Sequence, residues 1–338
     1  MSIALVLAAH AWIGQPVGKT RVWHFLGRGD LGVTIFFVIS GFLITTLLLR
    51  EEANTGRVSL RDFYVRRFFR IVPPFYVYLL AVLVAWRLGW LVSNRSAWLA
   101  SMCFVRDYAR VPWDWSTGHS WSLSIEEQFY LLWPCVLVLL GRKKALRLAL
   151  WLLVLVPVIR TVSHGIWNHG LADLFSFHTN ADSLMTGCTL ALIESKSWFR
   201  EAWRKIESPL FALFCVTFLV GISPALYLRF ASWYWLTLGM SLNNFAIAYA
   251  MFYVIRNPEG ITGRILNWKP VVHVGVLSYS LYLWQEPFLS PDTKHILLSL
   301  VAAFACAELS WYLVERPSRW VRDWIAMSCQ ALLVQVQR

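Results

Sequence analysis

The chain has 338 residues, of which 58% are hydrophobic and only 15% are charged, and its formal net charge is +12. Soluble domains carry about 25% charged residues, so this composition argues against a soluble protein and predicts a polytopic membrane protein. The basic excess is not typical of nucleic-acid binding, because the Lys and Arg residues lie mostly in short segments between apolar runs, as the positive-inside rule expects.

Apolar runs that are long enough, or nearly long enough, to cross a bilayer recur along the whole chain. With a short first run counted, they predict an all-α, polytopic membrane helix bundle of about ten transmembrane helices. This even count places most of the 31 Lys and Arg residues on one side, which predicts that both termini are cytoplasmic. The expected spans are residues 2–12, 31–50, 72–92, 124–140, 145–160, 179–195, 208–222, 232–255, 270–290 and 294–313.

The first run, residues 2–12, is short for a span. About twelve helical residues rise about 18 Å, whereas the hydrocarbon core is about 30 Å thick. We therefore expect a truncated first helix, and no cleavable signal peptide, since no basic region precedes this run. The longest external connection, 88–123, contains the apolar piece 97–105, which predicts a re-entrant or surface helix. One membrane-embedded domain over 1–320 and a cytoplasmic tail over 321–338 complete the expected organisation.

The first two helices carry polar residues within apolar runs. His10 lies in IALVLAAHAWIG. A neutral imidazole is suited to general-base work near pH 7, although a His hydrogen-bonded at the lipid interface would give the same pattern. Ser40 and Gly41 lie in GVTIFFVISGFLIT, where they predict close helix packing, with Ser40 as a candidate for a cavity wall.

The segment LRDFYVRRFFRIVPP alternates Arg66, Arg67 and Arg70 with aromatic residues on the expected cytoplasmic side. Arg67 and Arg70 are three residues apart and therefore share a helix face. Guanidinium groups suit phosphates. Spacing alone, however, favours a positive-inside anchor in the headgroup layer.

Two adjacent carboxylates, Glu126 and Glu127, precede an apolar run in WSLSIEEQFYLLWP. An acid at hydrocarbon depth costs about 2.5–3.5 kcal/mol on translocon scales, so such residues indicate a functional site by default. Glu127 has a structural alternative, because Ser124-x-x-Glu127 matches a capping box. Glu126 has none, and we expect it near the outer mouth of the bundle, on the same side as His10.

Later polar positions are more ambiguous. Asp182 in HTNADSLMTG begins an apolar helix, where capping and function are equally good interpretations. Glu286 is expected on the outer side, and Glu315-Arg316 in VERP predicts an interfacial ion pair and a helix stop. The six cysteines are scattered singly and indicate no disulfide framework. No metal site is expected either, because no zinc spacing is found among the loop histidines His24, His119, His164, His169 and His178.

The ordered set of these stretches resembles the integral-membrane acyltransferase family 3, over about residues 3–320. The resemblance rests on the apolar run with His10 and on SGFLIT, FYVRRFFRIVPP, WSLSIEEQFYLLWP, NADSLMTG, SYSLYLW and ERP. It implies a bacterial inner-membrane enzyme that moves an acyl group, most often acetyl, from cytoplasmic acyl-CoA to a hydroxyl of a sugar. The acceptors implied are surface polysaccharides, glycolipids, peptidoglycan or other glycans. No appended esterase-like domain is expected.

The same resemblance implies the site residues. The family's catalytic His matches His10, and its tandem acids match Glu126 and Glu127. Its Arg-x-x-Arg pair, implicated with the acyl-CoA donor, matches Arg67 and Arg70, and Arg66 is expected to bind the donor beside them.

The sequence departs from the family pattern in three places. The Arg that usually lies eleven residues before the His would fall before Met1. We therefore expect either that the true start of the protein lies upstream of Met1 or that this protein is catalytically impaired. Asn180 and Gln285 stand where many members have Arg and His, which leaves the roles of Asp182, Gln285 and Glu286 open.

The expected mechanism places the donor phosphates on Arg67 and Arg70 and admits the acceptor hydroxyl from the outer side. His10 removes the hydroxyl proton, and Glu126 orients the imidazole. A glycan transporter or flippase is the main alternative, since it explains the buried acids equally well. It does not explain an arginine face on the donor side.

Overall fold

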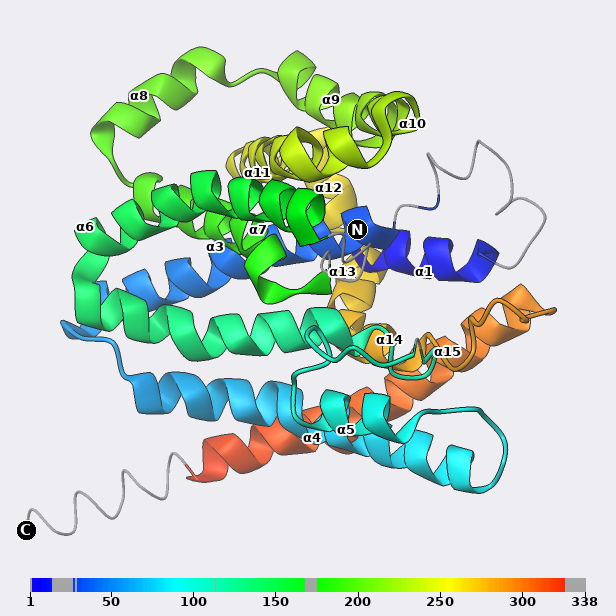
Figure 1. Cartoon of the computed structure of the whole chain (residues 1–338). Coiled ribbons are helices and arrows are strands. Elements are labelled where there is room, and N and C mark those ends of the chain that lie inside the picture. The colour runs from blue at the N-terminus through cyan, green and yellow to red at the C-terminus, as the bar shows by residue number, and fades with distance from the viewer. Residues whose placement is uncertain (1, 14–26, 28, 113, 168–174, 326–338) are drawn as a thin grey trace, which may run out of the picture.

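The computed structural model describes residues 2–13, 27, 29–112, 114–167 and 175–325, and over these residues it contains helices and no strand (Figure 1). The fold class expected from the apolar runs is confirmed. The α-helices are α1 Ser2–Trp12, α3 Gly29–Thr55, α4 Leu60–Arg87, α5 Arg95–Met102, α6 Ser120–Trp167, α7 Phe177–Ile193, α8 Ser197–Ile206, α9 Pro209–Thr217, α10 Ser223–Tyr234, α11 Met240–Arg256, α12 Ile261–Leu266, α13 Lys269–Val276, α14 Ser278–Trp284 and α15 Ile296–Ser310. Short π-helical segments, η3 Phe218–Ile222, η4 Trp235–Gly239 and η5 Trp311–Glu315, adjoin α10, α11 and α15.

Six helical stretches in the described part of the chain are long and apolar enough to cross a membrane. They are Gly29–Thr55, Leu60–Arg87, Ser120–Ser163, Pro209–Ala231, Trp235–Arg256 and Ile296–Ile325. The expected count of about ten crossings stays a prediction. The outer surface suits lipid, because large apolar side chains such as Leu139, Leu210 and Leu297 are 77–80% exposed.

Helix α6 contains two of the expected spans. Gly141 has φ 70° and ψ 166°, a conformation that breaks the helix and that glycine adopts without a steric penalty. The chain doubles back at this point, so the two arms of α6 lie antiparallel (Figure 1). The turn at Gly141 and the α3–α4 connection, residues 56–59, lie at the same end of the bundle (Figure 1).

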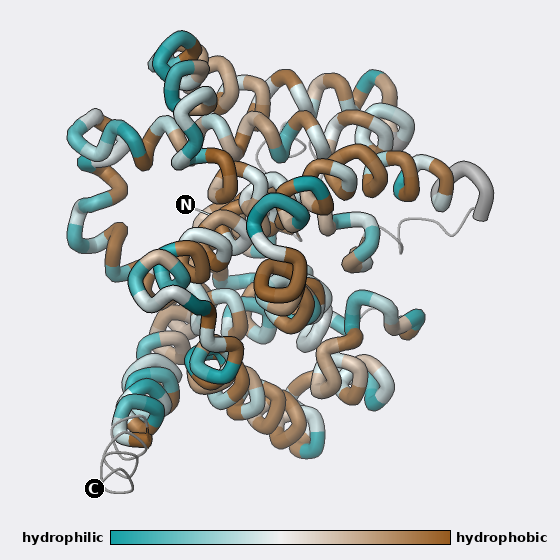
Figure 2. The backbone as a smooth tube through the Cα atoms, turned by 90° about the vertical axis from the view of Figure 1, so that its left-hand side faces the viewer, coloured by the Kyte–Doolittle hydropathy of each residue, from teal (hydrophilic) through white to brown (hydrophobic). Residues whose placement is uncertain are grey.

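We call this end the basic end, because Arg57, Arg61 and residues 142–144 (Arg-Lys-Lys) lie there. Figure 2 looks onto it and shows hydrophilic connections around mostly hydrophobic helices. The opposite end, which we call the loop end, carries residues 88–94, 103–112, 114–119 and 285–295. Near this end, the short helix α5 contains residues 97–102 of the apolar piece 97–105, where the sequence predicted a helix; whether that helix is re-entrant or at the surface stays a prediction.

Helices α3 and α7 cross at the centre of the bundle, where two glycines face each other's backbones. A Cβ atom on Gly41 would lie 2.0 Å from the carbonyl oxygen of Leu184, and one on Gly187 would lie 2.0 Å from that of Val38. The close packing predicted from Ser40-Gly41 is confirmed. Ser40, the preceding residue, points about 100° away from Gly41 around the helix.

Two local predictions are wrong. Helix α6 begins at Ser120, so Ser124 lies inside its second turn, where its hydroxyl donates to the Ser120 carbonyl. Ser124 and Glu127 therefore form no capping box.

The last helix does not stop at VERP either, because it continues to Ile325. The π-helical segment η5 widens the helix just before Pro317, which relieves the clash that a proline ring makes with a preceding carbonyl. Glu315 approaches Arg319 at 3.6 Å instead of pairing with Arg316.

Candidate active site

A cavity of about 260 Å³ lies between α1, α3, α4, α6, α13 and α14. Apolar side chains line most of it, and most of the charged or polar ones lie on α4, α6 and α14. The polar lining residues are Ser40, Arg67, Arg70, Ser122, Glu126, Tyr130, Ser278, Tyr279 and Tyr282, together with Ser2. Five stretches that the sequence singled out therefore line one cavity, although they are far apart along the chain.

Glu126 is the buried acid of this cavity, with 2% of its surface exposed. The hydroxyl of Ser40 donates to its Oε1 at 2.5 Å, and the hydroxyl of Tyr130 donates to the same oxygen. A buried carboxylate needs such donors to offset its lost hydration. Ser40 is the candidate cavity wall predicted from its position in α3, whereas Tyr130 was not identified from the sequence.

The arginines of α4 separate into two environments. Arg67 and Arg70 line the cavity, which confirms that they share a face. The guanidinium of Arg67 lies 5.0 Å from the centroid of the Tyr130 ring and 5.6 Å from that of Phe63. Arg66 does not line the cavity. It is largely exposed and pairs with Glu51 at 2.7 Å.

Arg70 is the exposed member of the pair, and among the described residues it makes no hydrogen bond or ion pair. Glu127 lies next to this group, where Arg67 and Glu126 act on it electrostatically. Its Oε1 is buried and has no hydrogen-bond partner in the part of the chain that the structure describes. The cavity therefore has a cationic wall with free donors beside a pair of acids.

His10 belongs to a second group, nearer the loop end. Its Nδ1 lies 2.9 Å from Oε1 of Gln285, and its Nε2 lies 3.9 Å from Oε1 of Glu286. Because an amide oxygen only accepts, Nδ1 carries the proton and Nε2 is left as the basic nitrogen. The ring also contacts Trp115 edge-on, with centroids 5.5 Å apart.

Glu286 is held by His119. The Nδ1–H of His119 donates to Oε2 of Glu286 at 2.6 Å, and the backbone N–H of His119 donates to the same oxygen at 3.2 Å. Both side chains are 1% exposed. Glu286 is therefore fixed between two imidazoles, with one oxygen toward each. The structure pairs His10 with Gln285 and Glu286, and pairs Glu126 with Ser40 and Tyr130, so the expected pairing of Glu126 with His10 is wrong.

Tyr282 connects the two groups. Its hydroxyl bonds to the carbonyl of His119 at 3.0 Å and to the hydroxyl of Ser122 at 2.5 Å, and both Tyr282 and Ser122 line the cavity. On α1, Val6 lines the cavity one turn below His10, a rise of about 6 Å. The cavity thus extends from the arginines on α4 to within one turn of the imidazole.

Asp182 lies apart from the cavity. It forms an ion pair with Arg160 at 2.7 Å, both side chains being 1% exposed, and accepts from Ser241 at 3.0 Å. The helix begins at Phe177, so Asp182 is not its N-cap. Sequence analysis left capping and function open for Asp182, and the structure excludes capping.

On the loop end, the connection before α6 packs against the start of α7. Burial raises the pKa of Asp107 to about 6, although hydrogen bonds from the Gln128 side chain and the Phe177 amide act in the opposite direction.

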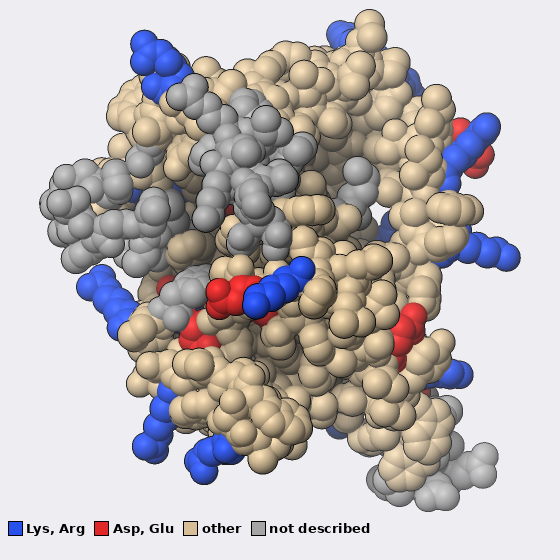
Figure 3. Space-filling view, turned by 90° about the vertical axis from the view of Figure 1, so that its right-hand side faces the viewer, with Lys and Arg blue, Asp and Glu red and all other residues tan. Residues whose placement is uncertain are grey.

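Figure 3 shows the loop end, where acidic side chains gather near the middle and most of the visible Lys and Arg lie toward the rim.

Residues that the sequence left without a role thus complete the site. Gln285 was noticed only as a variant of a motif, Glu286 only as an acid on the expected outer side, and His119 only as a histidine outside any zinc spacing. The available indication was their position in the sequence: His119 comes just before WSLS, and Gln285 and Glu286 come directly after SYSLYLW. Of the loop histidines, His24 and His169 lie outside the described residues.

The comparisons with known proteins agree with one another. The sequence matches the acyltransferase domain family over residues 1–307. It is 29% identical over 333 residues to a putative peptidoglycan O-acetyltransferase, YrhL, of Bacillus subtilis, covering 88% of this chain and 51% of the relative. It is 30% identical over 322 residues to the peptidoglycan O-acetyltransferase OatA of Listeria monocytogenes, covering 86% and 51%.

The O-acetyltransferase OatA of Staphylococcus aureus is 28% identical over 348 residues, covering 93% of this chain and 56% of the relative. The chain spans about half the length of these curated relatives. No solved structure matches it.

Proposed function

This chain belongs to the acyltransferase family that matches residues 1–307, and we propose that it transfers an acyl group, most simply acetyl, from acyl-CoA to a hydroxyl of a glycan. The observation that supports this most directly is the orientation of His10. Its Nδ1–H donates to Gln285, so its Nε2 is a free base, and Glu286 lies 3.9 Å from that nitrogen. His10 and Glu286 are the acid–base pair of the proposal, and Gln285 and His119 are positioning residues.

The reaction balances as a direct transfer. The acceptor oxygen attacks the thioester carbonyl, so that a C–O bond forms and the C–S bond breaks. Nε2 of His10 takes the hydroxyl proton and then gives it to the leaving sulfur, which departs as the free thiol. Glu286, which lies 3.9 Å from the same nitrogen, stabilises the imidazolium electrostatically between these steps. Gln285 holds the Nδ1 side of the ring, where a catalytic triad has its carboxylate.

The cavity suits the donor. Arg67 and Arg70 supply guanidinium donors for phosphates at its α4 side, which is the side nearer the basic end. The remaining length of the cavity is largely apolar and leads to within one turn of His10. In this proposal Glu126 stabilises the cationic wall electrostatically, and Glu127 lies beside it; neither takes the proton of the acceptor.

The descriptions of the relatives support a choice of acceptor, and the distribution of Lys and Arg supports an orientation in the membrane. Two of them are described as peptidoglycan O-acetyltransferases, so peptidoglycan is the glycan to test first. We place the chain in a bacterial inner membrane with the basic end in the cytoplasm, since Lys and Arg mark cytoplasmic connections. We propose no metal in the reaction. Among the described residues no group of three His, Cys, Asp or Glu side chains could hold one.

The proposal is tested with purified protein, radiolabelled acetyl-CoA and a soluble peptidoglycan fragment. The unchanged chain is expected to label the glycan. His10→Ala removes the base, so we expect labelling to fall by a factor of about 10²–10⁴. Arg142→Gln, at an exposed ion pair with Glu52, is the control and is expected to retain activity. Undiminished labelling by His10→Ala would contradict the assignment.

A further inference from the structure

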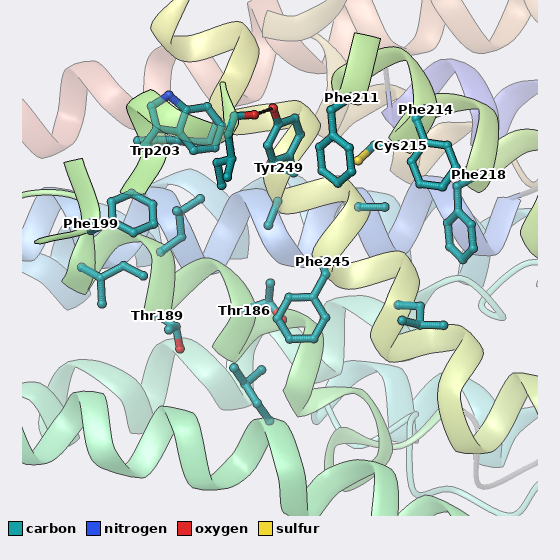
Figure 4. A pocket seen from close by; sticks show the side chains of 18 residues that line it. Thr186, Thr189, Phe199, Trp203, Phe211, Phe214, Cys215, Phe218, Phe245 and Tyr249 are labelled. Atoms are coloured by element: carbon teal, nitrogen blue, oxygen red, sulfur yellow. Dashed lines mark hydrogen bonds between the residues drawn. The ribbon is translucent and has the colours of Figure 1, made fainter. Parts of the chain in front are cut away.

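A second and larger cavity, of about 470 Å³, lies outside the candidate active site, between α6, α7, α8, α9 and α11 (Figure 4). It shares no lining residue with the first cavity. Its volume is within the range of about 300–1,000 Å³ that is typical of ligand sites. The reaction proposed above makes no use of it.

The lining of this cavity is almost entirely hydrocarbon. Six phenylalanines line it, together with aliphatic side chains. The hydroxyl of Tyr249 is already donated to the carbonyl of Ile206, and that of Thr186 to the carbonyl of Asp182. Only Thr189 and Trp203 keep a polar side-chain atom without a partner in the described structure. A sugar or nucleotide would lose its hydration here without replacement, which points to a hydrocarbon chain as the occupant.

The cavity is elongated along the helices. In Figure 4, Phe199 and Trp203 of α8 lie at one end of the labelled side chains, and Phe214 and Phe218 lie at the other. Helix α8 is nearer the basic end than α9 is (Figure 1), so the lining extends from that end, which we place at the membrane surface, toward the middle of the bundle. This is the direction in which a lipid acyl chain lies.

Helix α8 also has the charge that an anionic headgroup needs. Phe199, Trp203 and Ile206, at i, i+4 and i+7, line the cavity. Its other face carries three exposed cations, Arg200, Arg204 and Lys205, and one acid, Glu201. Within the described residues no ion pair involves these cations. A basic, aromatic amphipathic helix of this kind lies in the interface and attracts anionic lipid.

We propose that this cavity binds one acyl chain of an anionic glycerophospholipid, whose phosphate lies against Arg200, Arg204 and Lys205 of α8. Hydrocarbon fills the apolar part, where water would find too few partners. The three cations select an anionic headgroup over a zwitterionic one. This site is independent of the proposed acyl transfer.

Native mass spectrometry of the detergent-purified full chain tests the proposal, with dioleoyl phosphatidylglycerol and dioleoyl phosphatidylcholine added at equal concentration. We expect one phosphatidylglycerol to be retained, at least fivefold over phosphatidylcholine. The triple variant Arg200→Gln, Arg204→Gln, Lys205→Gln should abolish this preference. The matched control Arg142→Gln, Lys143→Gln, Lys144→Gln removes three cations at the Gly141 turn and should keep it.

A second variant tests the acyl-chain part without changing charge. Cys215→Trp places an indole in the cavity and should lower retention of both lipids at least fivefold, with a circular dichroism spectrum like that of the unchanged chain. If Cys215→Trp unfolds, competition by phosphatidylglycerols of short and long chain gives the same information, and the longer chain should win. Equal retention of the two lipids, an equal loss in the control triple variant, or full retention in folded Cys215→Trp would each overturn the proposal.

Discussion

Three arginines lie within five residues at the start of α4, and their surroundings give them different expected roles. Arg67 and Arg70 border the cavity, whereas Arg66 is engaged by Glu51 at 2.7 Å on the outside. A charge-assisted hydrogen bond to a phosphate is worth about 1.5–3 kcal/mol, which corresponds to about tenfold or more in affinity.

Replacing Arg67 or Arg70 by Gln should therefore raise the KM for acetyl-CoA about tenfold, with a smaller change in kcat. Arg66→Gln should raise it less than threefold. Initial rates against donor concentration give both constants. A KM for Arg66→Gln as high as that for Arg70→Gln would return Arg66 to the donor site, as the sequence suggested.

Asp107 predicts a pH dependence of stability. Its pKa in the folded chain is raised to about 6 by burial, whereas a free Asp titrates near 4. The folded state therefore holds the proton more tightly, and the contribution of this group to stability is present below pH 4 and is lost as the pH rises through 6.

The side chain of the variant Asp107→Asn does not titrate, so the variant does not lose this stability as the pH rises. Its apparent melting temperature relative to the unchanged chain should therefore rise between pH 4.5 and pH 7, as intrinsic fluorescence during heating would report. A difference that is constant over this range would mean that Asp107 does not titrate there.

The sequence could predict which polar residues lie around the cavity, but it could not predict how they pair. Three of the candidates, Arg67, Arg70 and Glu126, line the cavity. The fourth, His10, belongs to the neighbouring group that Tyr282 connects to the cavity. The partner of His10 is 275 positions away, and which of several acids meets it depends on how α1 packs beside α14. No local pattern contains that information.

At the level of helices, the crossing of α3 and α7 is the contact with the least tolerance. A Cβ on Gly41 would lie 2.0 Å from a backbone oxygen, which cannot move without shifting α7. Gly41→Ala is expected to destabilise the fold by about 1–3 kcal/mol, as overpacking does.

The measurement is the apparent melting temperature in detergent, with Gly221→Ala as the matched control. A Cβ on Gly221 meets nothing within 4 Å, so alanine there should leave the melting temperature unchanged or raise it slightly. If the melting temperature fell equally in both variants, the cause would be a general cost of replacing glycine by alanine. The close approach of the two backbones at Gly41 would then not explain the fall.

Helix positions could be predicted because apolar runs report where backbone must be internally hydrogen-bonded in lipid. Helix ends could not. Ser124 and Glu127 have the spacing of a capping box, yet Ser120 begins the helix one turn earlier. Pro317 has the form of a stop, yet the π-helical turn Trp311–Glu315 accommodates it. Both errors arise where tertiary packing overrides a four-residue pattern.

At the scale of the whole molecule, the two ends differ in chemistry. The basic end carries α8 and the short connections with Lys and Arg, and the loop end carries the longer connections and the His10 group (Figures 1 and 3). The first cavity joins these two environments, from Arg67 and Arg70 to within one turn of His10. A donor and an acceptor supplied from opposite sides of a membrane would meet at its far end.

This arrangement requires one orientation in the bilayer, which thiol labelling measures. Cys103 is exposed at the loop end, and Val92, at the same end, is 90% exposed. In intact spheroplasts a membrane-impermeant maleimide should label Cys103, and Cys103→Ser should remove that labelling. In the Cys103→Ser background, Val92→Cys should restore it, whereas Ala53→Cys, exposed at the basic end, should react only after permeabilisation. The reverse pattern would place Arg67 and Arg70 away from cytoplasmic acyl-CoA, and the donor would then have to reach the cavity from the other side.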